Sequence, residues 1–238
     1  MVRMTTATTG TSGTAAGITG LMTRMTGDEK HEPAATSTLD VLRVLYGRVL
    51  RVDPAHPDDP DRDRFLLSKG HGPMALYAVL AARGFLDPAA LDGFATYDSD
   101  LGHHPDRTLV PGVEISSGSL GHGLGLAVGT ALGLRLQGRA ARTVVLVGDA
   151  ELDEGSNAEA IQYAGRAGLA GLTAVVIDNR SASHGWPGGI AARFAVEGWV
   201  TADADGRDHD DLERAFGTPH DDRPLAVVAH VEPKGTPS

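Results

Sequence analysis

Two short apolar runs, joined by one predicted helix, constrain the fold of this 238-residue chain more than any other feature. Residues 143–147 and 172–177 are unbroken and rich in β-branched side chains, as expected of strands buried on both faces of a sheet. The sequence between them predicts a helix with a capping box at residues 156–159. Its expected core face is formed by Ala160, Tyr163, Ala164 and Ala167. Such a β-α-β unit implies parallel strands and a right-handed crossover.

The rest of the chain extends this unit. We expect three further helices: one that begins after Ser37, one from Pro73 to Arg83 and one from Leu120 to Leu134. A last strand is expected at residues 225–231. Residues 52–64, rich in Pro and Asp, and the polar residues 98–119 are predicted loops. We therefore predict an α/β fold with a doubly wound parallel sheet. Residues 1–15 are expected to be a disordered lead, and residues 16–238 a single domain.

Composition excludes several functional classes. The chain has 31 acidic against 21 basic residues, a net charge of −10, and no Lys/Arg stripe, so neither nucleic acid nor an anionic membrane is an expected partner. It has no cysteine, which excludes disulfides and thiolate chemistry. No apolar run approaches the length of about 18 residues that would span a bilayer. The first residues lack the apolar core of a secretory signal, and we expect a cytoplasmic protein.

Polar side chains directly follow the two buried strands. Asp149 comes after the first strand and Asn179 after the second, 179 − 149 = 30 residues later. Parallel strands bring their carboxyl ends to one edge of the sheet, where ligands bind. A carboxylate and an amide oxygen suit Mg²⁺ or Ca²⁺, and Mg²⁺ usually completes its shell with phosphate oxygens. Asp and Asn also form ordinary turns after strands, which is the simpler explanation for either residue alone.

A glycine-rich segment and scattered histidines complete the candidate chemistry. Residues 118–125, GSLGHGLG, open the long predicted helix, whose backbone N–H groups would attract an anion; close helix packing is the alternative. Five histidines stand in segments that are otherwise rich in Gly and Ser: His31, His71, His103, His104 and His122. A metal hydrolase using His71, His103, His104 and Asp149 lacks the usual ligand spacing.

Together these residues resemble a known family. Gly148-Asp149-Ala150 with the distal Asn179 is similar to the signature of thiamine diphosphate enzymes. The chain resembles the N-terminal half of transketolase in particular, in order, from about residue 31 to 235. The matching pieces are His31 with Asp40, residues 61–85, His104-Pro105, and residues 112–129, 144–160 and 225–235.

The resemblance implies thiamine diphosphate and Mg²⁺ (or Ca²⁺) as cofactors. It assigns the metal to Asp149, Asn179 and the carbonyl of Ser181. Around the cofactor it places His71, Gly118, Ser119, Leu120, Gly148, Ala150 and Ser183. His31 and His104 would face the bound sugar, and Glu154 would join an acidic network that links two cofactors across a dimer.

The chain departs from the family pattern at several positions. Ala150 replaces a glycine, His122 stands where Gln is usual, and Ser183-His184 replace an apolar residue and an acid near the thiazolium ring. A full transketolase is more than twice as long, and its other half carries the Glu that activates the aminopyrimidine. The resemblance thus implies one subunit of a split enzyme, two copies of which assemble with two copies of a separately encoded pyrimidine-binding partner.

The implied activity is transfer of a two-carbon ketol unit from a ketose or 2-oxo acid to an aldehyde. Two alternatives stay open. The α subunit of a 2-oxo acid dehydrogenase shares the Gly-Asp…Asn signature, although residues 68–72 (SKGHG) and 118–123 (GSLGHG) favour transketolase. A degenerate, non-catalytic scaffold subunit is suggested by Ala150, Ser183 and the short C-terminus.

Overall fold

A parallel sheet forms the centre of the molecule. The computed structural model describes residues 15–26, 32–70 and 72–233. Its strands are β1 (Arg64–Leu67), β2 (Thr143–Gly148), β3 (Leu172–Asp178), β4 (Val200–Asp205) and β5 (Leu225–His230). They are ordered β1-β2-β3-β5-β4, and every neighbouring pair is parallel. The predicted doubly wound α/β fold is therefore confirmed, and the carboxyl ends of all these strands share one edge.

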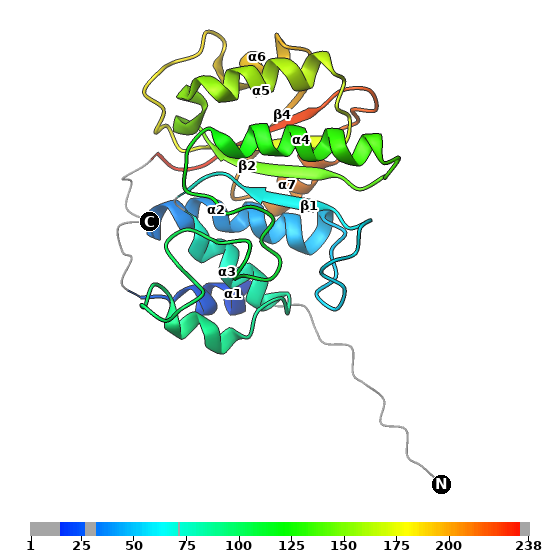
Figure 1. Ribbon diagram of the computed structural model, residues 1–238. Coiled ribbons are helices and arrows are strands. Elements are labelled where there is room, and N and C mark those ends of the chain that lie inside the picture. The colour runs from blue at the N-terminus through cyan, green and yellow to red at the C-terminus, as the bar shows by residue number, and fades with distance from the viewer. Residues whose placement is uncertain (1–14, 27–31, 71, 234–238) are drawn as a thin grey trace.

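Helices cover both faces of the sheet (Figure 1). One face carries α2 (Glu32–Val44), which continues as a π-helical turn (Leu45–Val49), together with α3 (Pro73–Ala82) and α7 (His209–Phe216); α1 (Ala15–Met22) packs on α3. The other carries α4 (His122–Leu136), α5 (Gly155–Arg166) and α6 (Gly189–Ala195). Short 3-10 turns span Pro88–Gly93 and Ala150–Asp153.

Alternation along the strands divides the core in two. Val144 and Leu146 of β2 pack into the apolar cluster beneath α2 and α3, whereas Val145 and Val147 pack into the cluster beneath α4 and α5. All of β2 is buried, which explains why its sequence is an unbroken apolar run. No helix in the described residues is long and apolar enough to cross a membrane.

Several predicted details are wrong at the element boundaries. The helix expected after Ser37 begins at Glu32, and Ser37 is buried inside it. The capping box of α5 does not form: Glu154 is the N-cap, and the Ser156 hydroxyl donates to the carbonyl of Gly121. Tyr163 is 51% exposed, and Ile161 occupies the core position instead.

Other elements were not predicted at all. Strands β1 and β4 and helices α1, α6 and α7 had no counterpart in the sequence analysis. Nearly all of the predicted disordered lead lies outside the described residues, and the assignment of residues 16–238 to one domain stays a prediction.

A close backbone approach joins α4 to β1. The amide of Gly123, in the first turn of α4, donates to the hydroxyl of Ser68 just after β1, with an N···Oγ distance of 3.1 Å. A Cβ at Gly123 would lie 2.2 Å from the Ser68 Cβ. The next glycines along α4 differ, because a Cβ at Gly125 or Gly129 would meet no atom within 4 Å.

We predict opposite effects for two alanine substitutions within α4. Gly123→Ala should lower the free energy of unfolding by about 1–3 kcal/mol, because the new methyl overlaps Ser68. Gly129→Ala should raise it by about 0.5–1 kcal/mol, because alanine has the higher helix propensity. Urea unfolding of both variants measures these changes. Equal effects at the two positions would show that the approach of α4 to β1 is not tight.

Candidate functional site

Asp149 joins the end of β2 to the loop that follows β3. Its carboxylate is 2% exposed and caps the 3-10 turn by accepting the amide of Ala150 at 2.8 Å. The same carboxylate accepts the amide of Ser181 at 2.6 Å, its hydroxyl at 2.5 Å, and the amide of Ala182 at 3.2 Å. The two predicted metal-binding strand ends are thus connected directly.

Asn179 lies at the neighbouring strand end with an unsatisfied acceptor. Strand pairing places Gly148 opposite Ile177, so Asp149 and Asn179 leave the same edge of the sheet. Asn179 is 7% exposed, and its Oδ1 is buried without a hydrogen-bond partner among the described residues. A buried acceptor without a donor is unfavourable. A hard cation would satisfy this oxygen, so the residues present fit the metal that the resemblance implies.

The loop after β3 also carries backbone strain. Arg180, between Asn179 and Ser181, adopts a left-handed conformation with φ of 55°, and its amide donates to Asp178. Left-handed backbone is unfavourable for a residue with a side chain and is concentrated at functional sites. Ala150 differs, since it is not among the residues with positive φ. The turn after Asp149 therefore does not require the family's glycine.

Three predicted segments converge beside this edge. The ring of His104 packs on Gly118, whose φ is +126°; a Cβ there would lie 2.9 Å from the His104 Cγ. Nδ1 of His104 lies 3.1 Å from the carbonyl oxygen of Gly70. A carbonyl only accepts, so Nδ1 carries the hydrogen of this bond. His31 and His71 lie outside the described residues, and their predicted roles stay predictions.

Two of the amides at the start of α4 already have acceptors within the chain. The amide of Gly121, its N-cap, donates to Glu151, and the amide of Gly123 donates to Ser68. Among the described residues, by contrast, nothing accepts a hydrogen bond from the amides of Gly118, Ser119 and Leu120. The backbone donors open to an anion therefore precede the helix.

Glu151 is a structural member of the site that sequence analysis missed. Its carboxylate is 1% exposed and accepts hydrogen bonds from the Ser68 hydroxyl, from the Gly121 amide at 3.0 Å and from the Gly148 amide at 3.3 Å. Burial raises the pKa of this carboxyl, while these donors and the charge of Lys69 oppose the shift. Glu151 thus fastens β1, β2 and the start of α4 to one another.

The remaining predicted residues lie nearby but are more open. Glu154 and Ser183 are exposed, as is Leu120. The amide of Ser183 donates to Asp153 at 2.9 Å. Among the described residues, no group of three or more His, Asp or Glu side chains could hold a metal. His71, which belongs with His103, His104 and Asp149 to the alternative hydrolase centre, lies outside the described residues.

Comparison with known proteins defines the family. Residues 25–231 match the family described as the transketolase, thiamine diphosphate binding domain. The chain belongs to this family. A transketolase variant from Pichia stipitis has the same fold, with a TM-score of 0.73 and 26% identity over 85% of this chain and 36% of that one.

Curated relatives include single subunits and full-length enzymes. The chain is 61% identical over 208 residues to the protein named Ferredoxin fas2 from Rhodococcoides fascians, covering 87% of this chain and 68% of that protein. It is 36% identical over 186 residues to one subunit of an apulose-4-phosphate transketolase from Phocaeicola vulgatus, covering 76% and 66%. It is 40% identical over 197 residues to transketolase 2 from Xanthobacter flavus, covering 75% of this chain but only 28% of that enzyme.

We predict that Glu151→Gln destabilises the chain. The amide nitrogen of glutamine would face one of the donors that the carboxylate accepts, which leaves that donor unpaired at a cost of about 1–3 kcal/mol. Denaturant unfolding measures the loss. Glu159→Gln, on an exposed part of α5, is the matched control, with an expected change within about 0.5 kcal/mol.

The effect of Glu151→Gln on the free energy of unfolding should also depend on pH. A raised pKa means that Glu151 contributes stability below its ordinary pKa of 4.5, and that this contribution is lost as the pH rises through the folded-state pKa. The difference in unfolding free energy between wild type and Glu151→Gln should therefore narrow as the pH rises through this range. A difference independent of pH would contradict the raised pKa.

Proposed function

We propose that this chain is the diphosphate-binding subunit of a two-component transketolase-like enzyme. With a separately encoded pyrimidine-binding subunit it would transfer a two-carbon ketol unit from a ketose or 2-oxo acid to an aldehyde. The single observation that carries the proposal is the buried Oδ1 of Asn179, unpartnered among the described residues, beside the carboxylate of Asp149. Relatives named as transketolase subunits support the division into two components.

The residues at the carboxyl edge suit a metal and a diphosphate. Asp149, Asn179 and the carbonyl of Ser181 would hold Mg²⁺, and Ca²⁺ would accept the same oxygens. The amides of Gly118, Ser119 and Leu120, together with His71, would bind the phosphate oxygens. When bound, the thiamine diphosphate supplies the carbanion chemistry that breaks and forms the carbon–carbon bond.

His104 would act on the substrate rather than on the metal. Its Nδ1 is committed to the carbonyl of Gly70, which fixes the ring and presents Nε2 as the group that exchanges a proton with a sugar hydroxyl. His31 would donate to a substrate oxygen in the same way. Glu154, exposed in this chain, would face a second copy.

Self-association would use the outer side of α4 and α5. Leu126 and Leu136 of α4 and Tyr163 of α5 are exposed, and a Cβ at Gly125 or Gly129 of α4 would meet no atom within 4 Å. Large exposed apolar residues beside small ones suit helix-on-helix packing. An assembly of two copies of this chain with two partners, located in the cytoplasm, stays the prediction made from the sequence.

The alternatives receive less support. The matched relatives described above include transketolases and a transketolase subunit, which favours ketol transfer over a 2-oxo acid dehydrogenase. Ala150 was one reason to consider a non-catalytic scaffold. Since that residue avoids positive φ, its methyl group does not by itself indicate a degenerate site.

We predict that Asn179→Ala separates metal binding from stability. The substitution removes a buried acceptor that has no donor among the described residues, so the free energy of unfolding without metal should stay the same or rise. Binding of thiamine diphosphate in the presence of Mg²⁺ should weaken by at least about 100-fold. Loss of a residue that only supports a metal ligand typically costs about 10–100-fold in metal affinity, and Asn179 would be a ligand itself. Calorimetry on the assembled enzyme measures the affinity, and denaturant unfolding of the chain measures the stability.

Thr143→Val is the matched control for this experiment. The hydroxyl oxygen of Thr143 is also buried without a partner among the described residues, but it lies at the start of β2, at the opposite end of the strand from Asp149. Its cofactor affinity should stay within about threefold of wild type. Unchanged affinity in a folded Asn179→Ala enzyme would refute the metal assignment and the proposed function with it.

We also predict that the purified chain alone shows no ketol transfer. The half of the family enzyme that carries the activating Glu has no counterpart among these 238 residues, and thiamine diphosphate would lie between the two chains. The assay measures transfer by this chain with and without the candidate pyrimidine-binding subunit, over sugar phosphates and 2-oxo acids. Full turnover by the lone chain would contradict the two-component enzyme. No turnover with the partner present would favour the scaffold.

A further inference from the structure

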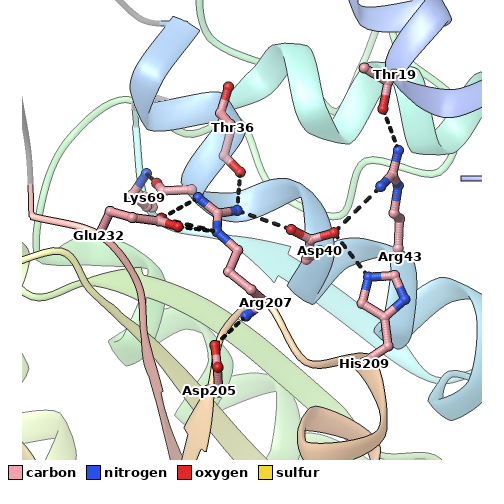
Figure 2. Close-up of polar contacts among 10 residues, drawn as sticks. Thr19, Thr36, Asp40, Arg43, Lys69, Asp205, Arg207, His209 and Glu232 are labelled. Atoms are coloured by element: carbon pink, nitrogen blue, oxygen red, sulfur yellow. Dashed lines mark hydrogen bonds and ion pairs between the residues drawn. The ribbon is translucent and has the colours of Figure 1, made fainter. Parts of the chain in front are cut away.

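Arg207 connects three segments at the carboxyl edge of the sheet (Figure 2). It follows β4 closely, and its amide donates to Asp205 at 2.9 Å. One end of the guanidinium donates to α2, at the Thr36 carbonyl (2.9 Å) and the Asp40 carboxylate (3.0 Å). The remaining nitrogens donate to the carboxylate of Glu232, which follows β5, at 2.6–3.1 Å.

The charges around this guanidinium are compensated locally. Asp40 and Glu232 balance Arg207, and Asp40 also contacts Nε2 of His209 at 2.9 Å and the guanidinium of Arg43 at 3.4 Å. Asp40 is only 18% exposed and Arg207 30% exposed, so water screens the pair weakly. With its donors committed on two sides, Arg207 is suited to fixing geometry rather than to binding a ligand itself.

The same part of α2 is also held at the end of β1. Lys69, which follows β1 by two residues, is buried and donates its ammonium group to the hydroxyls of Ser37 at 3.3 Å and Thr38 at 3.1 Å. Residues 36–40 of α2 are thus fastened to the edge of the sheet at β1 and at the ends of β4 and β5. In the sequence, α2 begins directly after His31, the residue expected to face the sugar.

We propose that Arg207 is a positioning residue for substrate: it sets the amino-terminal half of α2, the helix that follows His31 in the sequence, against the carboxyl edge of the sheet. This inference rests on the proposed function. It assigns Arg207 no contact with cofactor or substrate, so its effect should appear in the use of the sugar and not in the affinity for thiamine diphosphate.

Apolar packing alone does not fix this geometry. The buried side chains of α2, such as Leu42 and Val44, hold the helix against the sheet, but apolar contacts permit small shifts along the helix axis. A planar guanidinium that reaches a backbone carbonyl and two carboxylates permits far fewer positions. Lysine could not replace it, because a single ammonium group cannot span the same set of acceptors.

The chain supplies a matched control at the other end of the same helix. Arg48, in the π-helical turn that continues α2, pairs with Asp210 and Glu213 of α7, both at 2.8 Å. This pair also ties the α2 region to α7 through an arginine. It lies away from residues 36–40 in the sequence, so Arg48→Met removes a similar ion pair without releasing the first turns of α2.

The test compares Arg207→Met, Arg207→Lys and Arg48→Met by three measurements. Hydrogen exchange on the full chain reports the amides of residues 36–40. Steady-state kinetics on the assembled enzyme report kcat and KM for the sugar donor, and calorimetry reports the affinity for thiamine diphosphate. Each Arg207 variant should raise the exchange rate by at least about fivefold. Each should also lower kcat/KM by about tenfold or more, mainly through KM, with cofactor affinity within about twofold.

Arg48→Met should leave all three quantities within about twofold of wild type. Unchanged exchange at residues 36–40 in Arg207→Met, or equal effects of Arg48→Met, would overturn the inference. So would a loss of cofactor affinity as large as the loss of kcat/KM. An inactive wild-type complex would instead overturn the proposed function and the kinetic half of this inference, while exchange would still decide whether Arg207 fixes α2.

Discussion

A buried carboxylate organises the edge of the sheet on which the candidate site depends. Glu151 accepts hydrogen bonds from Ser68, Gly121 and Gly148, and so joins the ends of β1 and β2 to the start of α4. Burying a charge is unfavourable unless donors replace the lost water. Here those donors include the N-cap amide of α4. The amides of Gly118, Ser119 and Leu120, in the loop before the helix, have no acceptor among the described residues.

The polar side chains at the two strand ends next to this carboxylate differ in their hydrogen bonding. Asp149 accepts hydrogen bonds from Ala150, Ser181 and Ala182, whereas the side-chain oxygen of Asn179 is buried without a donor among the described residues. Asp149 thus places a hydrogen-bonded carboxylate beside the unsatisfied amide oxygen of Asn179. Together with the left-handed backbone at Arg180, this arrangement is locally unfavourable, and a bound cation would offset part of that cost.

The sequence predicted the parts of the site that follow from strand position. Asp149 and Asn179 stand directly after fully buried strands, whose unbroken apolar runs are the clearest pattern in the chain. Strand β4 was missed because much of it is exposed or half-buried and its sequence alternates with Asp. Glu151 was missed because one acid among 31 acidic residues has no periodicity that distinguishes burial from exposure. The predicted capping box at Ser156 was wrong because the Ser156 hydroxyl donates to the carbonyl of Gly121, which is distant in the sequence, instead of capping its own helix.

The two faces of the sheet therefore contribute different halves of the candidate site. On the α4 side, Glu151 and the approach of Gly123 to Ser68 fix the backbone around the expected diphosphate. On the α2 side, Arg207 and Lys69 hold the helix that follows His31 in the sequence, the residue expected to face the substrate. Ser68 and Lys69 are consecutive, so the end of β1 is tied to both networks at once. A displacement of this short edge strand would move both halves together, which couples the geometry of the cofactor region to that of the substrate region.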